Sequence, residues 1–72
     1  MFGFQGGETA GTVERKKVYM KEAQKIWPFL TNFDLSTIKN AMQLATMIKV
    51  RSGISIENAQ RDVQIWMQDK KF

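Results

Sequence analysis

The sequence predicts an all-α protein: a small, open three-helix bundle with a flexible N-terminal tail. Apolar residues recur at helical spacing in three segments, and no window of the chain alternates with the period of two that a strand requires. Residues suited to capping helices stand between the segments. Because 72 residues suffice for only one small domain, we expect a single helical domain over residues 12–72 and a tail over residues 1–11.

The tail is predicted from its glycine content. Four of the five glycines fall within residues 1–11, and glycine loses more conformational freedom on folding than any other residue. Phe2 and Phe4 are the exceptions in this segment, because aromatic side chains in a tail either dock onto the domain or contact a partner. We expect docking or fraying.

The first helix is expected over residues 12–27, a segment without Gly or Pro. Pro28 ends it, because the proline ring disfavours the α conformation at the preceding residue. Thr9 and Thr12 can both serve as the N-cap, which leaves the start of the helix open by several residues. The predicted core residues of this helix are Tyr19, Ala23, Ile26 and Trp27.

A second helical segment follows a junction rich in capping side chains at residues 31–34. Gly53 provides its expected left-handed stop. Asn40 is a poor residue for a helix interior, so a short turn at 34–39 can be separate from a main helix at 41–51. The predicted core residues here are Leu35, Ile38, Leu44 and Ile48.

The third helix has the clearest signals in the chain. Ser55 is a good N-cap, Glu57 in the first turn complements the helix dipole, and Lys70 and Lys71 lie near the end, where cations are favoured. Trp66 and Trp27 are the largest residues on the apolar stripes, and we expect them to anchor the core. The predicted core residues of this helix are Ala59, Val63 and Trp66.

Composition disfavours most enzyme classes. The chain has no Cys and no His, which removes thiolate chemistry, the commonest general base and the commonest metal ligand. The seven carboxylates are scattered, and no Gly-rich phosphate loop is present. We expect no catalytic activity, no cofactor and no metal. No apolar run approaches the ~18 residues that span a bilayer, so we expect a cytoplasmic protein without a membrane partner.

The charge balance raises the question of an anionic partner. The net charge is +4, and basic residues follow one another along the first helix. They form either an ordinary solvated face, interrupted by Glu14 and Glu22, or a surface for weak, non-specific nucleic-acid binding. A helix-turn-helix presenting Arg61 and Gln64 fits poorly, because Lys49 stands where a small residue is needed. The candidate anion-binding residues are Arg15, Lys16, Lys17, Lys21 and Lys25.

Met42, Met47 and Val50 widen the apolar side of the second helix beyond one stripe. Such a surplus is either additional core or a contact surface, and methionine side chains adapt well to mobile contacts. A weak homodimer through these three residues is therefore a second expectation, beside binding of a protein partner that the sequence does not name.

Residues 20–66 resemble the CsbD-like family of small bacterial stress-induced proteins, which lack an assigned biochemical activity. The resemblance rests on a Trp-x-x-Leu-Thr junction, a middle helix containing Gln-Leu, a glycine stop and a last helix that ends in Trp. It implies a non-enzymatic, cytoplasmic stress-response protein that acts through a binding surface. The alternative is a basic helical module that binds nucleic acid through the first helix. The matching positions are Trp27, Leu30, Thr31, Asp34, Leu35, Ile38, Gln43, Leu44, Ile48, Arg51, Gly53, Ile54, Ser55, Glu57, Ala59, Val63 and Trp66.

Overall fold

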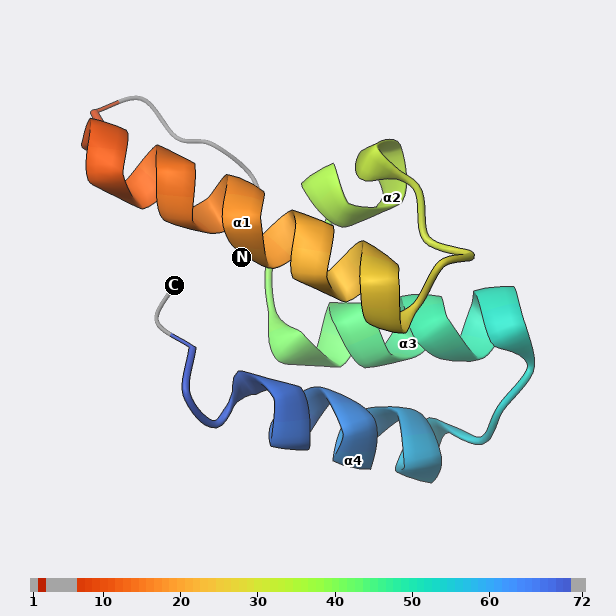
Figure 1. Ribbon diagram of the computed structural model, residues 1–72. Coiled ribbons are helices and arrows are strands. Elements are labelled where there is room, and N and C mark those ends of the chain that lie inside the picture. Colours follow the sequence, from red (N-terminus) through yellow and green to blue (C-terminus); the bar gives the residue numbers. More distant parts are fainter. Residues whose placement is uncertain (1, 3–6, 71–72) are drawn as a thin grey trace.

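The computed structural model describes residues 2 and 7–70, and the fold within these residues is all-helical, as predicted (Figure 1). The predicted short turn ahead of the main middle helix is a separate helix, so the described chain has four helices and no strand. These are α1 (Ala10–Ile26), α2 (Asn32–Ser36), α3 (Ala41–Ser52) and α4 (Ile56–Met67).

Helix α1 begins two residues earlier than the predicted position 12. Of the two candidate N-caps, Thr9 is the one used: its side-chain oxygen accepts the backbone N–H of Thr12 at 3.2 Å. The helix ends at Ile26, just ahead of Pro28, where the sequence predicts a stop.

Side-chain caps explain why α2 and α3 are separate. Thr31 and Asp34 form a capping box at the start of α2, with reciprocal hydrogen bonds of 3.0 and 3.1 Å. Asn40 is the N-cap of α3, where its side chain accepts the N–H of Gln43 at 2.9 Å. Helix α2 therefore occupies 32–36 rather than 34–39, and α3 ends at its predicted cap, Gly53, which has φ of 82°.

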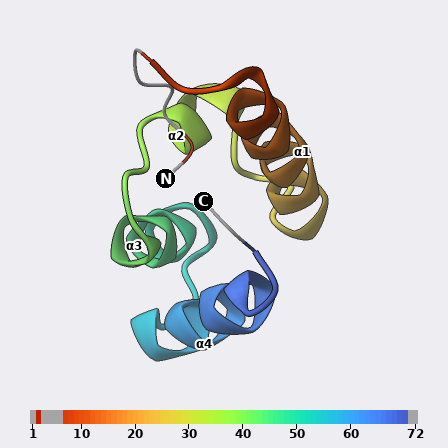
Figure 2. The same cartoon turned by 90° about the vertical axis from the view of Figure 1, so that its left-hand side faces the viewer.

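Helices α3 and α4 run antiparallel and make the most extensive helix–helix contact (Figure 1). Ser55 caps α4 by accepting the N–H of Asn58 at 3.2 Å, as the sequence predicts. Viewed from the side, α1 and α2 lie above α3 and α4, and the helices surround a common centre (Figure 2). The bundle is held together at this centre by side chains rather than by close approach of all the helix backbones.

Most of the predicted core is confirmed. Trp66 packs against other aromatic residues of the core, with its ring centroid 5.5 Å from that of Trp27 and 6.4 Å from that of Tyr19, which is half-buried. Ile26 was predicted to be buried and is 51% exposed. The chain leaves the helix at Trp27, whose indole takes the inward position, and this displaces Ile26 to the surface. The predicted residues that are buried are Ala23, Trp27, Leu35, Ile38, Leu44, Ile48, Ala59, Val63 and Trp66.

Of the outcomes expected for the aromatic residues of the tail, Phe2 shows docking onto the helical domain. This side chain is completely buried, its ring centroid lies 6.1 Å from that of Trp66, and its backbone N–H donates to the Ile38 carbonyl at 3.3 Å. The gain from burying a phenylalanine among aromatic rings exceeds the entropic cost of ordering this position. Residues 10 and 11 were also assigned to the tail, but they begin α1, because Thr9 caps the helix. The prediction for Phe4 concerns residues 1 and 3–6, which lie outside the described residues.

Candidate functional site

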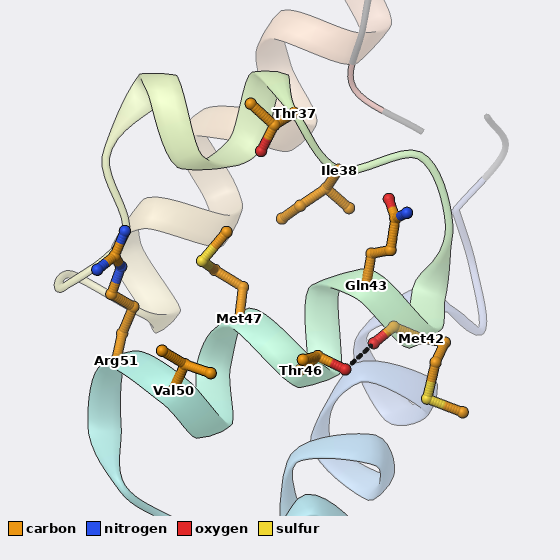
Figure 3. A pocket seen from close by; sticks show the side chains of 8 residues that line it. All are labelled: Thr37, Ile38, Met42, Gln43, Thr46, Met47, Val50 and Arg51. Carbon is orange, nitrogen blue, oxygen red and sulfur yellow. Dashed lines mark hydrogen bonds between the residues drawn. The ribbon is translucent and has the colours of Figure 1, made fainter.

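A pocket of about 410 Å³ lies between α3 and the end of α2 (Figure 3). The outer side of α3 supplies most of its wall, and the chain that follows α2 supplies the rest. We call this pocket and its rim the α3 groove. It is lined by Thr37, Ile38, Met42, Gln43, Thr46, Met47, Val50 and Arg51.

The three residues that the sequence analysis singled out on this helix all line the α3 groove. Met42 is 56% exposed and Val50 is 67% exposed, whereas Met47 is half-buried and packs against the core. Met47 is therefore additional core, whereas Met42 and Val50 are surface residues. The core of the described chain is complete without these two, so stability does not explain their apolar character.

The polar side chains of the groove are largely engaged within the protein. Thr46 Oγ1 donates to the Met42 carbonyl at 2.9 Å, and Gln43 Oε1 accepts the backbone N–H of Lys39 at 2.6 Å. In Figure 3, Gln43 and Met47 point from α3 toward the chain after α2, whereas Met42 extends toward α4. There its sulfur lies 3.2 Å from the side-chain nitrogen of Gln60. The rest of the groove surface is therefore better suited to apolar contacts than to catalysis.

Arg51 stands at one end of the groove, and Asp34 holds it there. The Arg51 guanidinium donates to Asp34 Oδ1 at 2.9 Å, and the other carboxylate oxygen accepts the Thr31 N–H. The Arg51 hydrogen bond, together with that from the Thr31 backbone, lowers the pKa of Asp34, although burial of the carboxyl opposes this. Asp34 is buried and Arg51 remains half-exposed, so the groove ends in a positioned cation.

The basic residues of α1 do not form the continuous set that was predicted. Lys16 is buried and ion-paired with Glu8, which removes it from the anion-binding candidates, because a buried paired ammonium does not meet a ligand. Lys17 and Lys21 line a smaller pocket of about 300 Å³, but Glu14 lies in the same pocket and offsets their charge. The candidates that are exposed are Arg15, Lys17, Lys21 and Lys25.

The other charged cluster is structural. Lys70 lies 5.3 Å from the Trp66 ring centroid and 5.7 Å from that of Tyr19, and it pairs with Glu22 and Asp69 at 3.4 and 3.0 Å. It ties the chain after α4 to α1. Within residues 2 and 7–70, no group of three or more potential metal-ligating residues lies together. No helix in the described part of the chain is long and apolar enough to cross a membrane.

Sequence reasoning missed the Asp34–Arg51 pair and the polar wall residues Thr37, Gln43 and Thr46. Asp34 and Arg51 are 17 positions apart on different helices, and no local spacing rule predicts such a contact. Asp34 did carry a signal as a capping residue, and the cap is what orients its carboxylate.

Comparisons of the chain with protein-family models, with curated proteins and with solved structures find no match. The geometry of the α3 groove and the sequence resemblance are therefore the grounds for a functional proposal.

Proposed function

We propose that this protein is a non-enzymatic binding protein that receives a helical segment of a protein partner in the α3 groove. The observation that carries the proposal is the exposure of Met42 and Val50 beside a pocket of about 410 Å³, on a helix whose opposite side is fully buried. An exposed apolar patch rimmed by polar residues is typical of a protein interaction site. Methionine side chains favour such a role because they adapt to the shape of a partner.

The dimensions of the groove favour a helix over a compact small molecule. Its lining on α3 extends from Met42 to Arg51, which at 1.5 Å per residue is about 13 Å, or two to three helical turns. Met42, Thr46 and Val50 follow one another at steps of four along this side. Apolar helices dock into grooves of this kind through anchors at i, i+3 or i+4, and i+7.

The resemblance to CsbD-like proteins supports a stress-response role in the cytoplasm as part of this proposal, with the partner still to be identified. Because that family lacks an assigned activity, the resemblance is compatible with a protein that acts through binding. The absence of Cys and His from the sequence supports the same conclusion.

Site-specific crosslinking tests the proposal. A photoreactive residue is placed at Thr46 in the groove and, as a control, at Gln68, which is exposed beyond the end of α4. Irradiation of cells that produce the protein should give a discrete protein adduct from position 46 only, and Val50→Glu should abolish it. Because Val50 is 67% exposed, this variant should fold. Equal adducts from both positions, or an adduct that Val50→Glu leaves unchanged, would contradict the proposal.

Weak nucleic-acid binding through α1 is the second candidate. It is supported by the exposure of Arg15, Lys17, Lys21 and Lys25, and it is weakened by the burial of Lys16. Weak homodimerisation through Met42, Met47 and Val50 would use the same surface as the proposed partner. Sedimentation of the purified protein over a range of concentrations distinguishes homodimerisation from binding of a different protein, because only self-association gives a mass that rises with concentration.

A further inference from the structure

We infer that a second binding site lies between the end of α1 and α4, and that its ligand is a small organic cation, a short apolar group that carries one ammonium. The site is a cleft of about 420 Å³. In Figure 2, α2 and α3 lie on the left, whereas α1 lies on the right and α4 at the bottom. We call the site the tryptophan cleft, and it is lined by Ile26, Trp27, Asp62, Ile65 and Trp66.

This inference does not rest on the proposed function. The tryptophan cleft and the α3 groove have no lining residue in common. The two sites can therefore be tested with separate variants, and either can fail without the other.

The two tryptophans form the inner wall of the cleft. Trp27 and Trp66 are 5% and 9% exposed, so only a small part of each indole reaches the cleft. Their ring planes are 80° apart and their centroids are 5.5 Å apart, which fixes each ring against the other. The inner wall is therefore apolar and rigid, as is typical of ligand pockets that are formed before the ligand binds.

Two exposed isoleucines stand at the rim. Ile26 is 51% exposed and Ile65 is 60% exposed, although the core of the described chain is complete without them. Ile65 is the one large apolar residue of α4 that is exposed. Asp62, Ile65 and Trp66 lie at positions i, i+3 and i+4, which places them on one side of the helix. The rim thus extends the apolar surface of the indoles outward and brings it next to a carboxylate.

The charge of the ligand follows from Asp62. It is the only charged residue that lines the cleft, and Lys25, which precedes Ile26 in the sequence, is not among the lining residues. Asp62 is exposed, and within residues 2 and 7–70 its carboxylate takes part in no hydrogen bond or ion pair. A ligand in the cleft therefore meets one carboxylate beside an apolar wall, and a positive charge on the ligand complements it.

The neighbouring cations are engaged elsewhere. Arg61 donates to Asn58 Oδ1 at 2.8 Å, within α4. Lys70 lies 5.3 Å from the Trp66 ring centroid, but it is paired with Glu22 and Asp69 at 3.4 and 3.0 Å and does not line the cleft. Neither residue neutralises Asp62.

The extent of the apolar surface favours a small molecule over a helix. The exposed residues of α4 around Ile65 are polar, so the apolar surface ends at the cleft, whereas in the α3 groove it continues from Met42 to Val50. The volume of about 420 Å³ lies in the lower part of the range of about 300–1,000 Å³ that ligand pockets have. With the ammonium beside Asp62, an apolar chain of about four to six carbons covers the one turn, about 5 Å, that leads to Ile65 and Trp66.

Three probes of the same length test the charge: hexylammonium, hexanol and hexanoate. Each is titrated into the isotopically labelled protein and followed by NMR. Hexylammonium should shift the indole N–H signals of Trp27 and Trp66 and the amide signals around Ile65, and it should bind about three- to fivefold more tightly than hexanol. Hexanoate should bind most weakly, because its carboxylate meets that of Asp62.

Two pairs of variants test the site. Asp62→Asn should remove the preference for hexylammonium over hexanol, whereas Glu57→Gln, the same charge change at an exposed position of α4 outside the cleft, should keep it. Ile65→Gln should weaken hexylammonium and hexanol alike. Val50→Gln, the same kind of change at a residue that is 67% exposed in the α3 groove, should leave both probes unaffected. All four positions are exposed, so these variants should fold.

The remaining outcomes would overturn the inference. Equal binding of hexylammonium and hexanol, or a preference that survives Asp62→Asn, would show that the ligand is not a cation. Binding that only Val50→Gln weakens would place the probes in the α3 groove, and no binding at all would remove the site while leaving the proposed function intact. A lysine-containing peptide that binds much more tightly than hexylammonium and depends on Asp62 would assign the cleft to a protein partner. Dimers that Ile65→Gln dissociates would assign it to a second copy.

Discussion

Phe2→Ala should destabilise the protein more than its position near the chain terminus suggests. Phe2 is completely buried against Trp66, and removing a buried phenylalanine side chain costs about 3–5 kcal/mol. A 72-residue domain is expected to have a free energy of unfolding of about 4–11 kcal/mol. The variant should therefore lose a large part of its stability. Phe2→Leu, which keeps apolar bulk at the site, should cost no more than about 1.5 kcal/mol.

Urea unfolding followed by tryptophan fluorescence measures this effect, since Trp66 is in contact with the altered site. With an m-value of about 1 kcal/mol/M for so small a chain, the midpoint should fall by about 3 M or more. Phe33→Ala is the matched control: the same atoms are removed from a side chain that is 75% exposed, and the change should be within about 0.5 kcal/mol. A Phe2→Ala midpoint that matches the Phe33→Ala midpoint would refute the assignment of Phe2 to the core.

Three further outcomes are expected. Gly53→Ala should lower the free energy of unfolding by about 1 kcal/mol, because alanine must adopt a φ of 82°. Gly11→Ala within α1 should instead raise it by about 0.5–1 kcal/mol. Equal urea midpoints for the two variants would contradict this expectation. Arg51 lowers the pKa of Asp34, so the interaction of the Asp34 carboxylate with Arg51 stabilises the folded protein at neutral pH. This stabilisation is lost as the pH falls through the folded-state pKa of Asp34. Arg51→Gln should therefore lower the free energy of unfolding more at pH 7 than at pH 3, and an equal loss at both pH values would argue against the pair. Duplex DNA should bind no more tightly than about 10 µM at physiological salt; sub-micromolar binding that is lost on reversing the charge of Lys17 and Lys21 would instead favour the nucleic-acid function.

Local sequence signals determined the helices. Asn40, Gly53 and Ser55 each act within one turn of the chain, through a side-chain cap or a left-handed backbone. Their effects are short-range, so they can be predicted from neighbouring residues. The ambiguity at the start of α1 had the same origin, because Thr9 and Thr12 offer the same chemistry three residues apart and only the folded chain chooses between them.

The candidate site was predicted in part. The surplus of apolar residues on the second helix identified Met42, Met47 and Val50, because helical periodicity shows which residues lie off the core stripe. The groove beside them depends on the chain after α2, and its cationic end depends on the contact between Arg51 and Asp34. These features require two helices to meet, which periodicity within one helix does not encode.

Tertiary structure alone decided whether a residue is buried or exposed when its neighbours in space are distant in the sequence. Phe2 is buried because Trp66 and Ile38 surround its place in the centre of the bundle, despite the glycines that follow it. Lys16 is buried because Glu8 folds back to neutralise it, and Ile26 is exposed because Trp27 turns inward in its stead. In each case the sequence determined the local conformation, whereas burial depended on which distant side chains filled the remaining space. The reason is that packing and charge neutralisation act through space rather than along the chain.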